Sequence, residues 1–306
     1  MSALADELGI ARLHIKDERT RMGLGSFKAL GAAFAIARAA DEAKKGSEEM
    51  DWTEVLKGQV FVTASAGNHG LSVAAGARIF GAKAVIYLAR TVPEAFAKRL
   101  RALDAEVVRA GHNYEESMEA AATAAETIGT LLSDSSWQGY EEMPLRVMEG
   151  YLQLAVETVS QIDSVPTHIF LQAGVGGLAA AVAAHARAVW GDAPQIIVVE
   201  PDAAPALFES VRAGALVTTT GPASGMGRLD CKTPSMIALA GLSRDADLFV
   251  TLSEEQAEDT VFKLGKYGLH STPSGVAGIA AVFSGLVPLS PKNRVLVILS
   301  ERPEGV

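Results

Sequence analysis

The sequence predicts an α/β protein made of two three-layer αβα domains, each with an open and mostly parallel sheet. Short apolar runs recur along the chain without alternating polar residues, which is typical of parallel strands buried on both faces. Helical segments separate most of these runs, and the succession strand, helix, strand indicates a parallel sheet covered by helices. The length of 306 residues fits two domains of ordinary size.

The expected strands are the apolar runs themselves, and the expected helices lie between them. Strands are predicted at 13–16, 59–63, 82–88, 106–109, 167–171, 195–199, 248–251 and 294–299. Helices are predicted at 26–40, from the turn after 63 to 80, at 93–102 and at 114–127. Polar stretches near Lys57 and Ser160 separate the compact runs. We therefore expect a small domain at 58–159 and a large domain formed by 1–57 together with 160–306.

Composition and charge exclude several classes of protein. Lys and Arg number 27 against 36 Asp and Glu, a formal net charge of −9. An acidic chain is a poor partner for phosphate backbones and anionic membrane surfaces, so we expect no nucleic acid and no membrane as partners. The histidines and Cys231 do not cluster at metal-ligand spacing, so no metal site is expected. A single cysteine and an N-terminus without a secretion signal favour the cytoplasm.

Three stretches carry residues suited to chemistry, and the first contains Lys28. This lysine opens an Ala-rich helical segment directly after Gly23, Gly25 and Phe27. Small and apolar neighbours desolvate an amine, which lowers its pKa and favours the neutral form that makes a Schiff base. Most lysines lie on a solvated surface. Lys28 is therefore a candidate for Schiff-base chemistry only when it is considered together with the other two stretches.

The second stretch is T-A-S-A-G-N-H-G at 63–70, where a strand ends and a helix begins. Its small residues let the backbone approach a planar or anionic ligand, and a helix N-terminus supplies N–H donors. The Asn68 amide is a suitable donor to a phenolate or carbonyl oxygen. The structural alternative is a turn in which Asn68 caps the helix.

The third stretch is Q-A-G-V-G-G-L at 172–178, after an apolar strand and before a helix. The N–H groups of such a glycine loop can hold one phosphate. A dinucleotide-binding fold has G-x-G-x-x-G and an acid about 20 residues further on. Glu200 lies near that range, so a nucleotide-binding oxidoreductase stays open here, although the glycine spacing fits it poorly.

In this order and spacing, the three stretches resemble the fold-type II pyridoxal-phosphate enzymes, the tryptophan synthase β-like superfamily. D-S-S-W-Q-G-Y-E at 134–141 and R-L-D-C-K-T-P-S at 228–235 are similar to the diaminopropionate ammonia-lyase branch. The similarity runs over essentially the whole chain. It implies pyridoxal 5'-phosphate as cofactor, bound in the cleft between the two domains and mainly by the large one. It also implies an amino acid substrate and a homodimer.

The resemblance assigns roles to particular residues. Lys28 would hold the cofactor, with Phe27 beside it, and would act with Asp134 as acid and base at Cα. Asn68 would bond the ring's 3′ oxygen, and Ser300 would meet the pyridine nitrogen, where a neutral hydroxyl favours β-elimination over transamination. The backbone of Gly174, Val175, Gly176, Gly177 and Leu178 would bind the phosphate. The substrate would contact Ser65, Ala66, Gly67, His69 and Asp134.

The sequence departs from the family pattern at three places. Ala66 stands where the branch usually has Asp, so the acid that could deprotonate a D-amino acid is absent, whereas Asp134 matches the aspartate linked to the L-isomer. Thr272 replaces an acid often found in its segment. The chain begins 27 residues before Lys28, so we expect part of the substrate rim to be missing or supplied differently.

The expected activity is therefore β-elimination from an L-amino acid similar to 2,3-diaminopropionate, giving a 2-oxo acid and ammonia. If hydroxide is the leaving group, the enzyme is an L-serine, L-threonine or 3-hydroxyaspartate dehydratase. An inactive relative that only binds an amino acid is a third alternative, which intact Lys28 and Asn68 oppose. Two local alternatives also stay open: Asp134 as a helix N-cap, and Arg228 with Asp230 as a structural ion pair.

Overall fold

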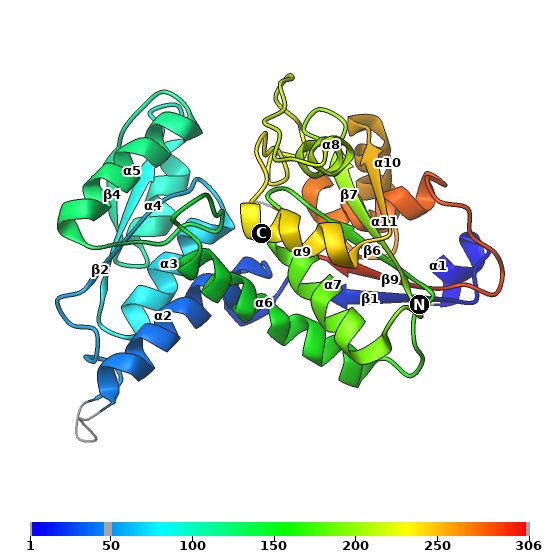
Figure 1. Ribbon diagram of the computed structural model, residues 1–306, viewed down its shortest axis with the longest axis horizontal. Helices are drawn as coiled ribbons and strands as arrows, with labels where there is room; N and C mark the ends of the chain where they lie inside the picture. Colours follow the sequence, from blue (N-terminus) through cyan, green and yellow to red (C-terminus); the bar gives the residue numbers. More distant parts are fainter. Residues whose placement is uncertain (1, 46–50, 304–306) are drawn as a thin grey trace. The chain divides into compact units, whose positions relative to one another are not determined.

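The computed structural model describes residues 2–45 and 51–303, and the chain divides into two compact units (Figure 1). Unit 1 consists of Met1–Phe27 and Tyr151–Val306, and unit 2 of Lys28–Gly150. Each unit contains one sheet whose recorded strand pairs are all parallel. The predicted α/β class with mostly parallel sheets is confirmed.

Unit 1 has a five-stranded sheet in the order β1-β9-β6-β7-β8. Its strands are β1 Arg12–Asp17, β6 His168–Gln172, β7 Gln195–Pro201, β8 Leu248–Leu252 and β9 Arg294–Leu299. Its helices are α1 Ser2–Glu7, the short 3₁₀ turn η1 Arg21–Gly23, α7 Gly177–Trp190, α8 Ala206–Ala213, α9 Met236–Asp245, α10 Glu254–Gly265 and α11 Pro273–Phe283. α11 packs on β6 and β9, and α7 packs against α9 and β6. A cluster of buried apolar side chains lies between α11 and the sheet, and it includes Phe170, Ile279 and Val297.

Unit 2 has a four-stranded sheet in the order β4-β3-β2-β5. Its strands are β2 Val60–Ala64, β3 Lys83–Leu88, β4 Glu106–Arg109 and β5 Thr130–Leu131. Its helices are α2 Lys28–Lys44, α3 Asn68–Ile79, α4 Glu94–Arg101 and α5 Tyr114–Ile128, and α6 Glu142–Gln161 begins here and continues into unit 1. Val62, Val85 and Ala121 are buried where α5 covers the sheet.

All the predicted strands form, within two residues at either end, and those at 106–109 and 294–299 have the predicted bounds. The unit boundaries differ from the expected 57/58 and 159/160. α2 belongs to unit 2 because it packs on α3, where the Ser72 hydroxyl donates to the Ala29 carbonyl at 3.2 Å. The start of α6 also belongs there, since a Cβ on Gly150 would lie 2.5 Å from the Leu30 carbonyl oxygen.

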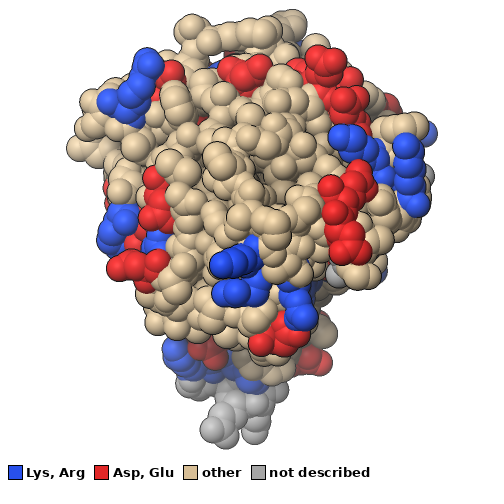
Figure 2. All heavy atoms as spheres, turned by 90° about the vertical axis from the view of Figure 1, so that its right-hand side faces the viewer, with Lys and Arg blue, Asp and Glu red and all other residues tan. Residues whose placement is uncertain are grey.

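Two features of the described residues concern possible membrane and metal partners. Within residues 2–45 and 51–303, none of the helices combines the length and the apolar content that a membrane span requires. No group of three or more His, Cys, Asp and Glu side chains is arranged to hold a metal ion in the described part of the chain. On the face shown in Figure 2, Lys and Arg are interspersed with Asp and Glu. That face therefore presents mixed charge rather than a basic tract.

Candidate active site

Lys28 and Asp134 form an ion pair in unit 2, although 106 positions separate them in the sequence. Lys28 is the first residue of α2, and Asp134 lies in the loop after β5. The two side chains are only 21% and 16% exposed. Burial acts to raise the pKa of Asp134, but the positive charge of Lys28, a smaller contribution from His69 and the hydrogen bonds of the carboxylate together hold that pKa below its usual range. The two predicted catalytic residues are thus together, and the N-cap alternative for Asp134 is wrong, because the next helix begins only at Glu142.

The loop that carries Asp134 is fixed on one side by His69. His69 lies in α3, is buried, and places Nε2 2.8 Å from the Leu132 carbonyl oxygen. A carbonyl only accepts, so Nε2 carries the proton and donates it. Burial lowers the pKa of His69, and Lys28 adds to this effect while Asp134 opposes it. The ring is therefore neutral near pH 7, and its recorded hydrogen bond anchors the backbone two residues before Asp134.

Tyr140 fixes the same loop from its other end. Its hydroxyl accepts from the Ser133 N–H at 3.0 Å and donates to the Leu131 carbonyl at 2.8 Å. Its ring stacks on Trp137 with the centroids 4.4 Å apart. Burial raises the pKa of Tyr140, so the hydroxyl keeps its proton. The D-S-S-W-Q-G-Y-E motif is visible in the sequence, but only the structure shows that the Tyr140 hydroxyl bonds the backbone of Leu131, the last residue of β5.

Ser65 organises the turn that begins α3. Its Oγ accepts from the N–H groups of Gly67 at 3.2 Å and Gly70 at 3.0 Å. Gly70 has no room for a side chain, since a Cβ would lie 2.8 Å from the Ser65 carbonyl oxygen. The helix N-cap is Gly67, and Asn68 is the first helical residue, so the alternative in which Asn68 caps α3 is wrong. Ala66 lies in the turn between Ser65 and Gly67.

In unit 1, residues 174–178 form the loop from β6 into α7, which we call the phosphate loop. Gly176 has φ +100° and is the N-cap of α7. Among the described residues, none of the five N–H groups of this loop donates to a protein acceptor. Free N–H groups at the positive end of a helix dipole bind phosphate. The loop therefore fits a phosphate group.

Ser300 follows β9 and is buried. Its carbonyl accepts from the Phe27 N–H at 3.1 Å, and the Phe27 ring packs edge-on against Tyr151 with the centroids 5.0 Å apart. Gln172 joins this strand end to the phosphate loop, since its Nε2 donates to the Ile298 carbonyl at 2.9 Å. Sequence reasoning did not assign Gln172, although a buried glutamine ending an apolar strand was an available signal.

Glu301 is a second buried polar residue that sequence reasoning did not assign. It accepts a 2.5 Å hydrogen bond from Thr272, and the Arg228 Nε lies 3.4 Å from its carboxylate. A carboxylate thus lies against Thr272, the position where the family pattern led us to expect an acid. Asp230 pairs with Lys232 at 2.7 Å, and the alternative that Arg228 and Asp230 form a structural ion pair stays a prediction.

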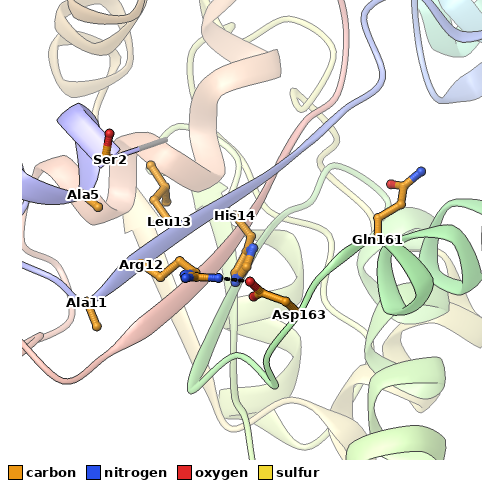
Figure 3. A pocket seen from close by; sticks show the side chains of 8 residues that line it. All are labelled: Ser2, Ala5, Ala11, Arg12, Leu13, His14, Gln161 and Asp163. Atoms are coloured by element: carbon orange, nitrogen blue, oxygen red, sulfur yellow. Dashed lines mark hydrogen bonds and ion pairs between the residues drawn. The ribbon is translucent and has the colours of Figure 1, made fainter.

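Unit 1 also contains a cavity of about 390 Å³ beside β1 (Figure 3). Its polar lining includes Arg12, His14, Gln161 and Asp163, and Arg12 forms an ion pair with Asp163. None of the predicted site residues lines it. The cavity is therefore separate from the residues that the sequence singled out.

A partly buried lysine paired with a carboxylate, a glycine loop that fits a phosphate and a buried serine after the last strand are the features expected of a pyridoxal-phosphate enzyme, and the chain belongs to that class. Residues 1–301 match the family model for pyridoxal-phosphate dependent enzymes. The chain is 35% identical over 272 residues to diaminopropionate ammonia-lyase of Salmonella typhimurium, covering 83% of this chain and 67% of the relative. It is 33% identical over 297 residues to the Escherichia coli K12 enzyme of that name, covering 91% and 74%.

A solved structure and a more distant relative agree with this assignment. Diaminopropionate ammonia-lyase from Escherichia coli, in complex with an aminoacrylate-PLP azomethine reaction intermediate, is 30% identical with a TM-score of 0.88, covering 98% of this chain and 82% of that one. L-threonine ammonia-lyase of Thermotoga maritima is more distant, at 26% identity over 286 residues, covering 93% of this chain and 66% of the relative. The predicted fold-type II resemblance is confirmed, and the cofactor is pyridoxal 5'-phosphate.

Proposed function

We propose that this pyridoxal-phosphate-dependent enzyme is an ammonia-lyase that eliminates the β-amino group of L-2,3-diaminopropionate as ammonia. Water then releases the α-amino group as a second ammonia and leaves a 2-oxo acid. The observation that carries the proposal is the partly buried ion pair of Lys28 with Asp134. When bound, the cofactor supplies an electron sink that acidifies the Cα proton of an amino acid. The similarity to diaminopropionate ammonia-lyases over most of the chain supports this substrate.

The charge state of the pair fits this substrate. Because the pKa of Asp134 is held low, its carboxylate is ionised at neutral pH and already accepts an ammonium group. The β-ammonium of 2,3-diaminopropionate presents the same chemistry as the Lys28 side chain. Asp134 would therefore hold the leaving amine once Lys28 turns to the Cα proton.

The other predicted residues would bind and orient. The turn 65–67 at the N-terminus of α3 offers N–H donors for the substrate carboxylate. The phosphate loop would hold the cofactor phosphate, and the Asn68 amide would donate to the ring oxygen. Ser300 would offer the pyridine nitrogen a neutral hydroxyl, and Phe27 would border the cofactor. His69 would act indirectly, because its hydrogen bond to the Leu132 carbonyl holds the loop that carries Asp134.

A hydroxyamino acid dehydratase is the second candidate. The similarity to L-threonine ammonia-lyase favours it, and a hydroxyl needs no anionic partner as it leaves. The intact Lys28–Asp134 pair opposes the third alternative, an inactive amino-acid-binding relative. We also infer a cytoplasmic homodimer, from the single cysteine and the family resemblance, which size-exclusion chromatography with light scattering would test.

The experiment is an absorbance spectrum of the purified protein, followed by assays of ammonia and 2-oxo acid. L-2,3-diaminopropionate, L-serine and L-threonine are compared, with D-2,3-diaminopropionate as the stereochemical control. We expect a yellow protein that turns over L-2,3-diaminopropionate fastest, and a Lys28→Ala variant that loses both colour and turnover. Faster turnover of L-serine or L-threonine would transfer the assignment to the dehydratase. Comparable rates on the D-isomer would contradict the interpretation of Ala66.

A further inference from the structure

Glu200 is a buried carboxylate in unit 1 to which the proposed reaction gives no role. It lies in β7, only 1% exposed. Its two carboxylate oxygens accept from the N–H groups of Leu207 at 2.8 Å and Phe208 at 2.7 Å, in the first turn of α8. In the described part of the chain no Lys or Arg side chain pairs with it. Burial raises the pKa of Glu200 to about 7, although the backbone donors oppose that rise, so it is the ionised form, above about pH 7, that accepts with both oxygens. Both oxygens are used, so Glu200 is unavailable to a ribose, which removes the basis of the nucleotide-binding alternative.

Helix α8, whose first turn Glu200 binds, packs against the phosphate loop. Leu207 is fully buried, and its Cδ1 lies 3.1 Å from the position that a Cβ on Gly176 would occupy. Ala238 and Leu242 of α9 approach the same point at 3.1 and 3.3 Å. The apex of the loop therefore rests on a platform of three side chains, and Leu207 belongs to the turn that Glu200 holds.

Glu200 also neighbours the start of the loop through the sheet. The carbonyl of Val199, the preceding residue, accepts from the Ala173 N–H at 2.9 Å. Val199 is paired in register with Gln172, the last residue of β6. The end of β7 is thus linked to both ends of the loop. Its backbone bonds Ala173, which precedes the loop, and the α8 turn that Glu200 binds places Leu207 against Gly176.

We propose that Glu200 is a positioning residue for cofactor phosphate: through the first turn of α8 and Leu207, its carboxylate sets the conformation in which the phosphate loop aims its N–H groups at one point. A carboxylate accepts two N–H groups at once, whereas an amide accepts with one oxygen only. Replacing Glu200 by Gln therefore sets an N–H₂ group against one backbone N–H and displaces the first turn of α8. The displacement is passed to Gly176 because close-packed side chains transmit it.

The test compares binding of pyridoxal phosphate with binding of pyridoxal, which lacks the phosphate, to the cofactor-free protein by absorbance titration. We expect Glu200→Gln to weaken pyridoxal phosphate binding about tenfold, the size of one lost charge-assisted hydrogen bond. Pyridoxal binding should be unchanged. The matched control is Glu209→Gln in the same helix, whose carboxylate pairs with Arg212 and which should change neither affinity.

Unchanged pyridoxal phosphate affinity in Glu200→Gln, or an equal loss for both ligands, would overturn the proposal. If Glu200→Gln does not fold, Leu207→Ala decides, since it keeps the carboxylate bonds but removes the contact with Gly176. It should show the same phosphate-specific loss, and an unselective loss would count against the proposal. Because the readout is cofactor affinity, an error in the substrate assignment would leave this result intact.

Discussion

At Asp134 a carboxylate is held ionised beside an amine, and this state can be tested by removing its charge. We expect Asp134→Asn to lower turnover of L-2,3-diaminopropionate by at least about 100-fold, the lower end of what a positioned acid or base contributes. The yellow chromophore should persist because Lys28 is intact. Asp104→Asn is the control, since Asp104 is an exposed partner of Arg78. Turnover within a few-fold of wild type would remove Asp134 from the reaction.

His69 provides a pH-dependent test of the same region. Burial lowers its pKa in the folded protein, so below about pH 6.5 the unfolded chain binds a proton that the folded chain does not. The His69 contribution to stability is therefore present above that pH and lost as the pH falls, by up to about 1.4 kcal/mol per pH unit. Urea unfolding from pH 7.5 to 5.5 should show a smaller loss in His69→Gln than in wild type. The exposed His112→Gln variant should retain the wild-type slope; equal slopes in all three proteins would contradict the assignment.

Among the elements, the phosphate loop gives the sharpest prediction. Gly176 has φ +100°, and a Cβ there would lie 3.1 Å from Ala238 and Leu207, so Gly176→Ala adds backbone strain of about 1–3 kcal/mol and a close contact. We expect cofactor affinity to fall at least about tenfold. Gly191→Ala at the other end of α7 is the matched control, since Gly191 also has positive φ but open space around it. If both variants bind the cofactor equally well, the conformation of Gly176 is not what the phosphate requires.

How far the sequence predicts each element depends on the range of the interaction that forms it. Buried parallel strands such as β4 and β9 are visible as local apolar runs, and the glycine loop before α7 as a local motif. β5 has only two residues and pairs with β2, so no local pattern marks it. The boundary at Lys28 was missed because the packing of α2 on α3 is tertiary. Likewise the bonds of Gln172 and Glu301 join segments far apart in sequence, and no spacing within one segment predicts them.

For the whole molecule, the consequence of this division is that the residues predicted to hold the cofactor belong to different units. Unit 2 provides Lys28, while unit 1 provides the phosphate loop and Ser300. A ligand that needs folded residues in both units stabilises both, by about 2.7 kcal/mol at 100 times its Kd. Trp190 lies in unit 1, while Trp52 and Trp137 lie in unit 2, so Trp190→Phe leaves tryptophan fluorescence that reports on unit 2 alone. The complementary variant, with Trp52 and Trp137 changed to Phe, reports on unit 1.

We expect pyridoxal phosphate to raise the urea midpoint in both variants, and to bring together any two midpoints that differ in the cofactor-free protein. Pyridoxal 5'-phosphate reduced with borohydride before mixing cannot react with Lys28, so it tests binding without the covalent bond to unit 2. It should raise the unit 1 midpoint more than the unit 2 midpoint. A shift confined to one unit with intact pyridoxal phosphate would mean that the cofactor is held by that unit alone, and the joint role of Lys28 and the phosphate loop would fail.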